Sequence, residues 1–328
     1  SLTTYHVENP EEDVFKKDVE RFAGICRILK GLKNFKIGAV GARPNAFNTV
    51  RFSEKMLEKL GISVETIDLS EIFSKMRKIP DQDTKVIEKI NELKNRFKVK
   101  IVPDEALRQM AKFAIVLEEW MSENDIGATA IQCWTSMEEN VHITPCAIMS
   151  LLSENLKPSA CEVDIMGALS MYVLQLASGT PSALVDWNNN YKDENEVILF
   201  HCGNFPVSFY EEVEMRYADV IGTIVGSENA YGSCTGRIKA SPFTFLRIST
   251  DDEKGVMRAY VGEGEITGED PKTFGSRGVA RIDKLQDLMK YICREGFEHH
   301  VAINLSRTSD IIKEALENYL NIETYHHR

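Results

Sequence analysis

FKIGAVGARPNAFNTVRFSEKMLEKLGISVETIDL, residues 35–69, decides the fold class. It opens with a short apolar run, 35–41, and closes with 62–69, in which apolar and polar residues largely alternate. Both runs are typical of strands, and the segment between them predicts a helix that Gly61 ends. Strand, helix and strand in this order form a βαβ unit, which requires parallel strands joined by a right-handed crossover. The sequence therefore predicts an α/β fold with a doubly wound parallel sheet.

The segments downstream continue this alternation of strands and helices. Residues 104–123 carry their apolar side chains on one face, as an amphipathic helix does. The run IGATAIQCW, 126–134, predicts a buried strand, and 144–154 predict another helix. The charged segment 79–100 predicts an exposed helix.

A helix is also predicted near the N-terminus. Asn9 and Pro10 have the residue types of an N-cap and a first helical position. The apolar residues that follow recur at helical spacing and predict one buried face, formed by Phe15, Val19, Phe22, Cys26 and Leu29.

From about residue 220 the pattern changes to short β-rich runs separated by glycine, serine and aspartate. These runs are 221–232, 235–250, 255–267 and 278–283. Several short strands with turn residues between them predict an antiparallel barrel or sandwich.

The C-terminal segments return to helices and a strand. Residues 284–294 and 309–319 predict helices on either side of a strand at 299–304. We therefore expect two domains: an α/β, Rossmann-like domain over 1–178 and a β-rich C-terminal domain, with some αβ elements, over 179–328.

Composition excludes several classes of partner. The 328 residues carry a net charge of -11 without a basic cluster, which argues against nucleic acid. The longest apolar stretch, 165–177, is too short to cross a bilayer. The seven cysteines form no CxxC motif and most lie in apolar runs, so we expect reduced core thiols and a cytoplasmic protein. The first residues contain no apolar h-region, so we expect no signal peptide. Because the chain begins with serine, we expect a processed protein or a fragment of a longer one.

The candidate chemistry is concentrated in residues 159–204 and in a histidine pair near the C-terminus. Glu162 precedes an apolar run, while Asp186 and His201 each end a predicted strand; His299 and His300 open a later one. Carboxylate and imidazole donors favour Mn²⁺, Mg²⁺ or Co²⁺, and such a site supports Lewis-acid chemistry and proton transfer.

Each of these residues also has a purely structural interpretation. Ser159 and Glu162 have the spacing of a capping box at a helix start. Asp186 suits an Asx turn, and a histidine after an apolar run is often a core residue. His326 and His327, beside the terminal arginine, suggest a frayed tail, and no role is assigned to them.

Four further residues are candidate substrate contacts. Asn188 and Asn204 follow the strands that carry Asp186 and His201 and suit hydroxyl groups. Arg43 lies in the turn after the first strand, and Trp134 follows the strand 126–134. Ligands of open α/β sheets bind at this end of the strands. The turn around Arg43 does not fit GxGxxG, so a nucleotide site is disfavoured.

Several segments, in this order, resemble the L-fucose isomerase / L-arabinose isomerase superfamily, in particular its branch of L-fucose isomerase-related proteins. They span most of the chain and include KIGAVGARPNAFNTVRFSE (36–54), AIQCW (130–134), PSACEVDIMGAL (158–169), ALVDWNNNY (183–191), LFHCGNFP (199–206), GRIKASPFTFLRIS (236–249) and GFEHHVAI (296–303).

The resemblance implies a metal-dependent aldose–ketose isomerase that acts on an open-chain sugar through an enediol. It implies Glu162 and Asp186 as catalytic residues. It also implies a divalent ion, most often Mn²⁺, whose ligands are Glu162, Asp186, His201 and, from the His299–His300 pair, His300. It also implies a homo-oligomer, a trimer or hexamer, and a further N-terminal domain before the segment that begins here.

Two alternatives stay open. The same fold suits a sugar-binding protein without catalytic activity, and the same donor residues suit a metal-dependent aldolase or dehydratase. The sequence does not name the sugar.

Overall fold

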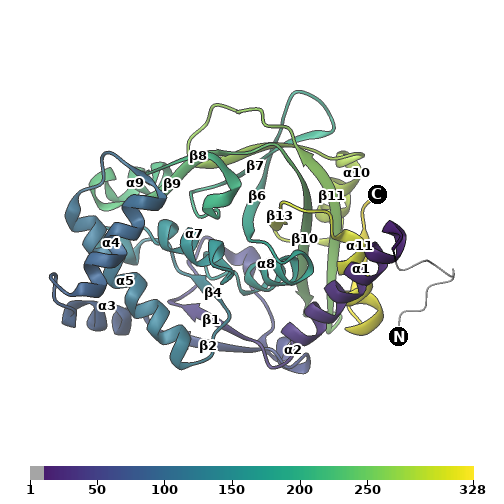
Figure 1. The fold of residues 1–328 in the computed structure, drawn as a ribbon, viewed down its shortest axis with the longest axis horizontal. Helices are drawn as coiled ribbons and strands as arrows, with labels where there is room; N and C mark the ends of the chain where they lie inside the picture. The colour runs from purple at the N-terminus through teal and green to yellow at the C-terminus, as the bar shows by residue number, and fades with distance from the viewer. Residues whose placement is uncertain (1–10) are drawn as a thin grey trace.

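The computed structural model describes residues 11–328, so the predicted N-cap at Asn9 and Pro10 lies outside the described residues. A parallel sheet forms first along the chain, with strand order β2-β1-β4-β5 (Figure 1). Its strands are β1 (Lys36–Val40), β2 (Ser63–Ile67), β4 (Ala128–Ile131) and β5 (Ser159–Cys161). The predicted βαβ unit and parallel sheet are confirmed.

The helices of this part largely follow the predicted periodicity, and α5 coincides with the predicted helix. They are α1 (Asp13–Gly31), α2 (Glu54–Lys59), α3 (Leu69–Lys78), α4 (Thr84–Arg96), α5 (Asp104–Glu123), α6 (Ser136–Val141), α7 (Cys146–Glu154) and α8 (Ile165–Ser178). The single exposed helix predicted over 79–100 was wrong in extent. Its helical part is α4, which starts late because Pro80 follows α3 and the Asp83 side chain caps α4 by accepting from the Lys85 N–H.

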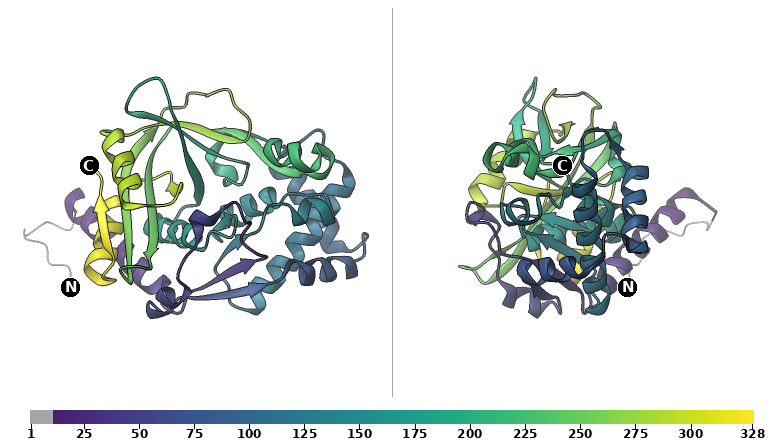
Figure 2. Two further views of the ribbon diagram at one scale, coloured as in Figure 1. Left: turned by 180° about the vertical axis from the view of Figure 1, so that it is seen from behind. Right: turned by 90° about the vertical axis from the view of Figure 1, so that its left-hand side faces the viewer.

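The apolar face predicted for α1 was also wrong. Val19 and Phe22 are 50% and 47% exposed, whereas Ile25 and Ile28 are buried. The buried residues of the helix, Gly24, Ile25 and Ile28, lie in its C-terminal half, which faces α8 and α11 (Ser309–Glu314), and Arg21 pairs with Glu314; the first turns project from the body of the molecule (Figure 2).

Within residues 11–328, six antiparallel strands close into a barrel, as the β-rich runs predict. Successive neighbours around it are β11, β10, β13, β6, β7 and β12, and β12 pairs back to β11. The strands are β6 (Ser182–Asn190), β7 (Glu196–His201), β10 (Ser241–Asp251), β11 (Val256–Ile266), β12 (Ser276–Arg281) and β13 (His300–Asn304).

Further strands extend the barrel sheet at both edges. On one side, β9 (Tyr231–Ile238), β8 (Tyr210–Tyr217) and β3 (Lys98–Val99) continue from β12; on the other, β14 (Glu323–His326) pairs with β11. The C-terminal end is therefore ordered, and its interpretation as a frayed tail was wrong. His327 is buried, and its Nε2 lies 2.7 Å from the carbonyl oxygen of Asp283.

One predicted β-run, 221–232, is partly helical. It contains most of α9 (Asp219–Val225), followed by Gly226 with φ 89°, a backbone conformation that favours glycine. Its apolar residues lie four apart, at Ile221 and Val225, and pack in one small cluster with Trp134, so helical spacing prevailed over β propensity. The last helix, α10 (Leu285–Glu295), agrees with the prediction.

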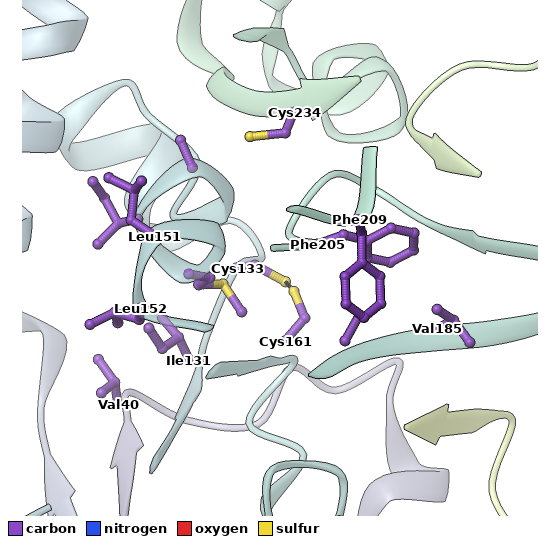
Figure 3. Close-up of a cluster of buried hydrophobic side chains, with 14 of the residues drawn as sticks. Val40, Ile131, Cys133, Leu151, Leu152, Cys161, Val185, Phe205, Phe209 and Cys234 are labelled. Atoms are coloured by element: carbon purple, nitrogen blue, oxygen red, sulfur yellow. Dashed lines mark hydrogen bonds between the residues drawn. The ribbon is translucent and has the colours of Figure 1, made fainter. Parts of the chain in front are cut away.

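Helix α8 lies between the parallel sheet and the barrel and positions the site. It contacts β10, β13 and β6 on one side and β4, β5 and β1 on the other (Figure 1). A large apolar cluster joins the same two layers near Cys133, Cys161, Phe205 and Val185 (Figure 3). The predicted domain limit at 178/179 coincides with the end of α8 and stays a prediction. No helix in residues 11–328 is long and apolar enough to cross a membrane.

Candidate active site

The backbone brings four of the predicted residues together where the parallel sheet meets the barrel. Glu162 directly follows β5, Asp186 lies within β6, His201 ends β7 and His300 begins β13. The antiparallel register pairs His300 with Asp186 and Asp186 with Phe200, so neighbouring strands deliver these side chains to one place.

His300 lies at the centre of the cluster. Its Nε2 is 2.9 Å from Glu162 Oε2 and 3.4 Å from Asp186 Oδ1. A carboxylate oxygen of Glu162 and one ring nitrogen each of His201 and His300 lie within 4.8 Å of one another. A carboxylate oxygen of Asp186 and one ring nitrogen each of His299 and His300 do so too. Glu162, His201 and His300 are only 4%, 1% and 0% exposed.

The buried polar atoms of this cluster lack ordinary partners. Glu162 Oε2, His201 Nε2 and His300 Nε2 have no hydrogen-bond partner among the described residues, even though Glu162 and His300 approach closely. Buried polar groups are normally satisfied, so these atoms fit a site that is completed by a bound ion or substrate.

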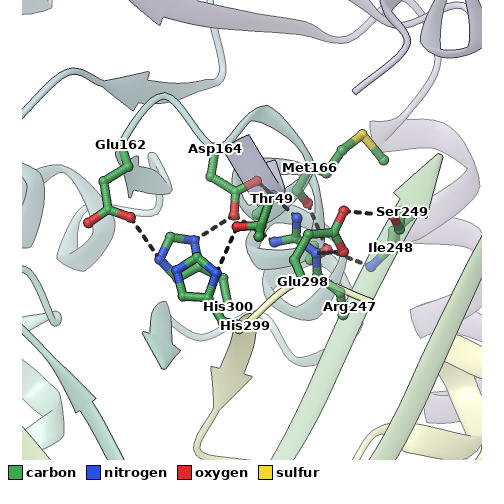
Figure 4. A network of polar contacts seen from close by, with 12 residues as sticks. Thr49, Glu162, Asp164, Met166, Arg247, Ile248, Ser249, Glu298, His299 and His300 are labelled. Carbon is green, nitrogen blue, oxygen red and sulfur yellow. Dashed lines mark hydrogen bonds and ion pairs between the residues drawn. The ribbon is translucent and has the colours of Figure 1, made fainter. Parts of the chain in front are cut away.

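Behind His300 lies a fully paired network (Figure 4). His300 Nδ1 is 2.8 Å from Asp164 Oδ2, and Arg247 donates to the two oxygens of Asp164 over 2.6 and 3.1 Å. Arg247 Nε also donates to Glu298 over 3.0 Å, and the Ser249 hydroxyl donates to Glu298 over 2.7 Å. An acceptor at Nδ1 orients the ring so that Nε2 faces the other carboxylates.

This network sets the charges of the site. Burial alone raises the pKa of Asp164, but the Arg247 guanidinium and His300 outweigh it and hold that pKa well below its ordinary value. Burial likewise raises the pKa of Glu162, and the nearby His300 more than offsets this and lowers it. For His300, burial lowers the pKa, but Glu162 and Asp164 raise it well above its usual range. Both carboxyl groups are therefore anions at neutral pH.

The start of α8 shows why Glu162 points into the site. The capping-box interpretation was wrong, because the N-cap is Asp164, whose Oδ1 accepts from the Gly167 N–H over 2.8 Å. Glu162 and Val163 have φ of 59° and 55°, which is uncommon for residues other than glycine. This turn separates Glu162 from the helix.

The opposite side of His300 is open. The side chains of Asp186 and His299 are 26% and 38% exposed, and His299 Nε2 lies 3.8 Å from Asp186 Oδ1. His299 Nδ1 is 3.0 Å from the Thr49 hydroxyl. The ring of Phe47 lies 6.4 Å from that of His299 and 5.7 Å from that of Trp134, so aromatic side chains border this opening.

The predicted substrate contacts are dispersed. Asn188 is exposed on the strand of Asp186, two residues further along. Asn204 is buried with both side-chain polar atoms unpaired in the described chain, and so is the indole nitrogen of Trp134. Arg43 donates to Asn48 and lines a cavity of about 880 Å³ between the two layers. None of Glu162, Asp186, His201 and His300 lines this cavity.

Sequence reasoning missed Asp164, Arg247 and Glu298. Two signals were present. Asp164 directly precedes an apolar helical run, as an N-cap does. Arg247 lies within the largely apolar run FTFLRIS, residues 243–249, which is buried throughout, and a buried arginine needs carboxylate partners.

The site of carboxylate and imidazole side chains lies at the junction of a parallel sheet and a closed barrel. Comparisons with known proteins relate this arrangement to sugar isomerases. Residues 199–327 match the family described as "L-fucose isomerase, C-terminal domain". A sulfoquinovose isomerase of Priestia aryabhattai is 27% identical over 321 residues, which cover 96% of this chain and 70% of that protein. Another, of Alkalicoccus urumqiensis, is 26% identical over 318 residues, 94% of this chain and 68% of the relative.

These matches confirm the resemblance that the sequence motifs indicated. Residues 199–327 match the C-terminal domain of L-fucose isomerases, and nearly the whole chain is similar to sulfoquinovose isomerases.

Proposed function

We propose that this chain is a sugar isomerase that interconverts an open-chain aldose and ketose with the help of a divalent metal ion. The observation that carries the proposal is the convergence of Glu162, Asp186 and His300. Glu162 Oε2 lies 2.9 Å and Asp186 Oδ1 lies 3.4 Å from His300 Nε2, and this nitrogen makes no hydrogen bond within the described residues.

These residues fit a hard or borderline divalent ion. Oxygen and imidazole donors suit Mn²⁺, Mg²⁺ or Co²⁺, and Mn²⁺ is the ion we propose. Glu162, Asp186 and His300 would hold it. When bound, such an ion polarises the hydroxyl and carbonyl oxygens of a sugar and stabilises negative charge on them.

Glu162 and Asp186 would move the protons. Both carboxylates approach the same imidazole nitrogen, and a sugar bound beside that nitrogen would present its adjacent carbons C1 and C2 to both of them. In the proposed reaction one of them removes a proton from C2 or C1, and the other transfers a proton between O1 and O2. The planar enediol can then be protonated at the other carbon, which completes the isomerisation.

His201, predicted as a further ligand, suits a different role. The Cys202 N–H donates to its Nδ1 over 2.9 Å, so in the neutral ring the proton lies on Nε2. We assign His201 Nε2–H as a donor to a sugar oxygen. Trp134, Asn188 and Asn204 would contact the remainder of the sugar, and Arg43 a more distant part.

The sugar itself is to be found by testing. The named relatives act on sulfoquinovose, so it is tested beside L-fucose and L-arabinose. We further propose a cytoplasmic homo-oligomer, from the reduced-thiol composition and the family resemblance.

The decisive experiment measures isomerisation and deuterium incorporation at C2 in D₂O, with Mn²⁺ supplied. Glu162→Gln should lower turnover by about 10²–10⁴-fold, because it removes a base without changing shape. Glu211→Gln, on the exposed face of β8, serves as the matched control and should leave turnover unchanged. Sugar binding without exchange would identify a binding protein, and exchange with loss of water would identify a dehydratase; either result contradicts the proposal.

A further inference from the structure

Two buried cysteines lie beside Glu162. The Sγ atoms of Cys133 and Cys161 are 2.7 Å apart (Figure 3). One ligand-type atom from each, together with one from Glu162, lies within 4.8 Å of the others. The proposed isomerase reaction uses neither thiol.

The parallel sheet holds this arrangement in place. Cys161 ends β5 and pairs with Ile131 of β4, and Cys133 follows Ile131 by two residues. Side chains two residues apart project to the same face of extended chain. Both cysteines therefore lie on one face of the sheet, next to the turn that carries Glu162.

The chemistry of these donors differs from that of the first site. Two sulfur atoms with one carboxylate favour thiophilic ions such as Zn²⁺ and Cd²⁺, whereas His300 with Asp186 favours harder ions. Glu162 belongs to both donor sets. Glu162 is 4% exposed, and its Oε2, which lies 2.9 Å from His300 Nε2, makes no hydrogen bond within residues 11–328, so this buried carboxylate can still accept a metal ion.

We propose that Cys133, Cys161 and Glu162 form a second metal site, selective for thiophilic divalent ions. Binding would release the two thiol protons to solvent, since thiolates are the ligands. Two sulfur atoms at about 2.3 Å from one tetrahedral ion lie roughly 3.8 Å apart, so the side chains must separate by about 1 Å through small rotations.

The shared carboxylate has a consequence for activity. An ion on the two sulfurs draws Glu162 away from His300, so Zn²⁺ or Cd²⁺ displaces the ion of the first site and inhibits the enzyme. This second statement rests on the proposed function, whereas the thiolate site does not.

The thiolate site is tested by titrating reduced, metal-free protein with Cd²⁺ and following the ultraviolet charge-transfer band of cadmium thiolates. A Cys26→Ala, Cys293→Ala background removes the two exposed thiols. We expect a band that saturates at about one equivalent and is lost in Cys133→Ala and in Cys161→Ala. Cys146→Ala, which removes a buried thiol outside the donor set, is the matched control and should keep it. No band in the background protein, or a band that survives in both Cys133→Ala and Cys161→Ala, would overturn the site.

The sharing of Glu162 is tested by electron paramagnetic resonance of Mn²⁺. Cd²⁺ should release bound Mn²⁺ from the background protein and not from its Cys161→Ala variant. Cd²⁺ binding without release overturns the sharing. If Mn²⁺ never binds, the proposed function fails, and the cadmium band still decides the thiolate site. Circular dichroism shows which variants are folded, and either single cysteine variant suffices.

Discussion

Asp164 and Glu138 are both fully buried carboxyl groups, but their surroundings are opposite. Asp164 contacts Arg247, His300 and the Gly167 N–H, whereas neither oxygen of Glu138, in α6, has a hydrogen-bond partner in the described part of the chain. Burial raises the pKa of Glu138 to about 8, while the partners of Asp164 hold its pKa well below the ordinary value. Burial without partners therefore favours the neutral form of Glu138 near pH 7, whereas Arg247 and His300 keep Asp164 an anion.

The difference matters for function because His300 depends on Asp164. A permanent anion at Nδ1 keeps the ring oriented in one way. The charged residues behind His300, Asp164 and Arg247, thus hold its ring in place. The other side of the ring, which faces Asp186 and His299, stays accessible to a substrate.

The largest expected effect comes from removing Arg247, the cation that pairs with Asp164 and Glu298. Arg247→Met should lower the free energy of unfolding by about 3–5 kcal/mol, because it leaves Asp164 and Glu298 buried without their charge partner. Urea unfolding at pH 7 measures it. The matched control is Arg277→Met, which breaks a bidentate pair with the partly exposed Asp270 and should cost about 1 kcal/mol or less. Equal losses in the two variants would contradict the comparison.

The next largest effect concerns Glu138, the buried carboxyl group without hydrogen-bond partners in the described residues. The folded pKa of Glu138 is raised from its ordinary 4.5 to about 8, so the folded state binds its proton more tightly than the unfolded state does. Stability from this group is present below about pH 4.5 and is lost as the pH rises towards 8. Glu138→Gln cannot ionise, so its stability relative to the parent should rise by about 2–4 kcal/mol between pH 5 and pH 8. Urea unfolding of both proteins at the two pH values checks this, and a constant difference would show that Glu138 does not titrate in this range.

A smaller effect is expected from neutralising Asp164 itself. Asp164→Asn should weaken Mn²⁺ binding by about 10–100-fold, because a neutral amide supports His300 less well than a carboxylate. Asparagine also caps helices, so the start of α8 is retained. Calorimetric titration of Mn²⁺ measures the change. The control is Asp270→Asn, because Asp270 pairs with Arg277 and contacts none of the proposed metal ligands. Unchanged affinity in Asp164→Asn would mean that the buried network has only a structural role.

Local periodicity accounts for what could be predicted of the fold. The helix at 104–123 and the strands at 36–40 and 63–67 follow from spacing of apolar residues within a few turns or pleats. Periodicity failed in α1 because helical spacing shows which face is apolar, not whether a neighbour covers it; there the exposed residues include Val19 and Phe22.

The candidate site was predictable in part. Glu162, Asp186 and His300 stand out because polar residues follow or open apolar strands, and the structure brings all three together. The capping interpretation of Glu162 failed because the turn at 162–163 moves the helix start to Asp164. No pattern of side chains predicts the positive φ angles of this turn.

The sequence by itself determined the α/β class, the β-rich C-terminal half and the donor residues, since these follow from periodicity and from residue type. Only the tertiary structure decided which donors meet. The pairing of Arg247 with Asp164, 83 positions apart, and the contact of Cys133 with Cys161 depend on strand register and on the packing of α8 between two layers. Such contacts arise between distant segments, and side-chain charges there are set by burial and partners that no local pattern contains.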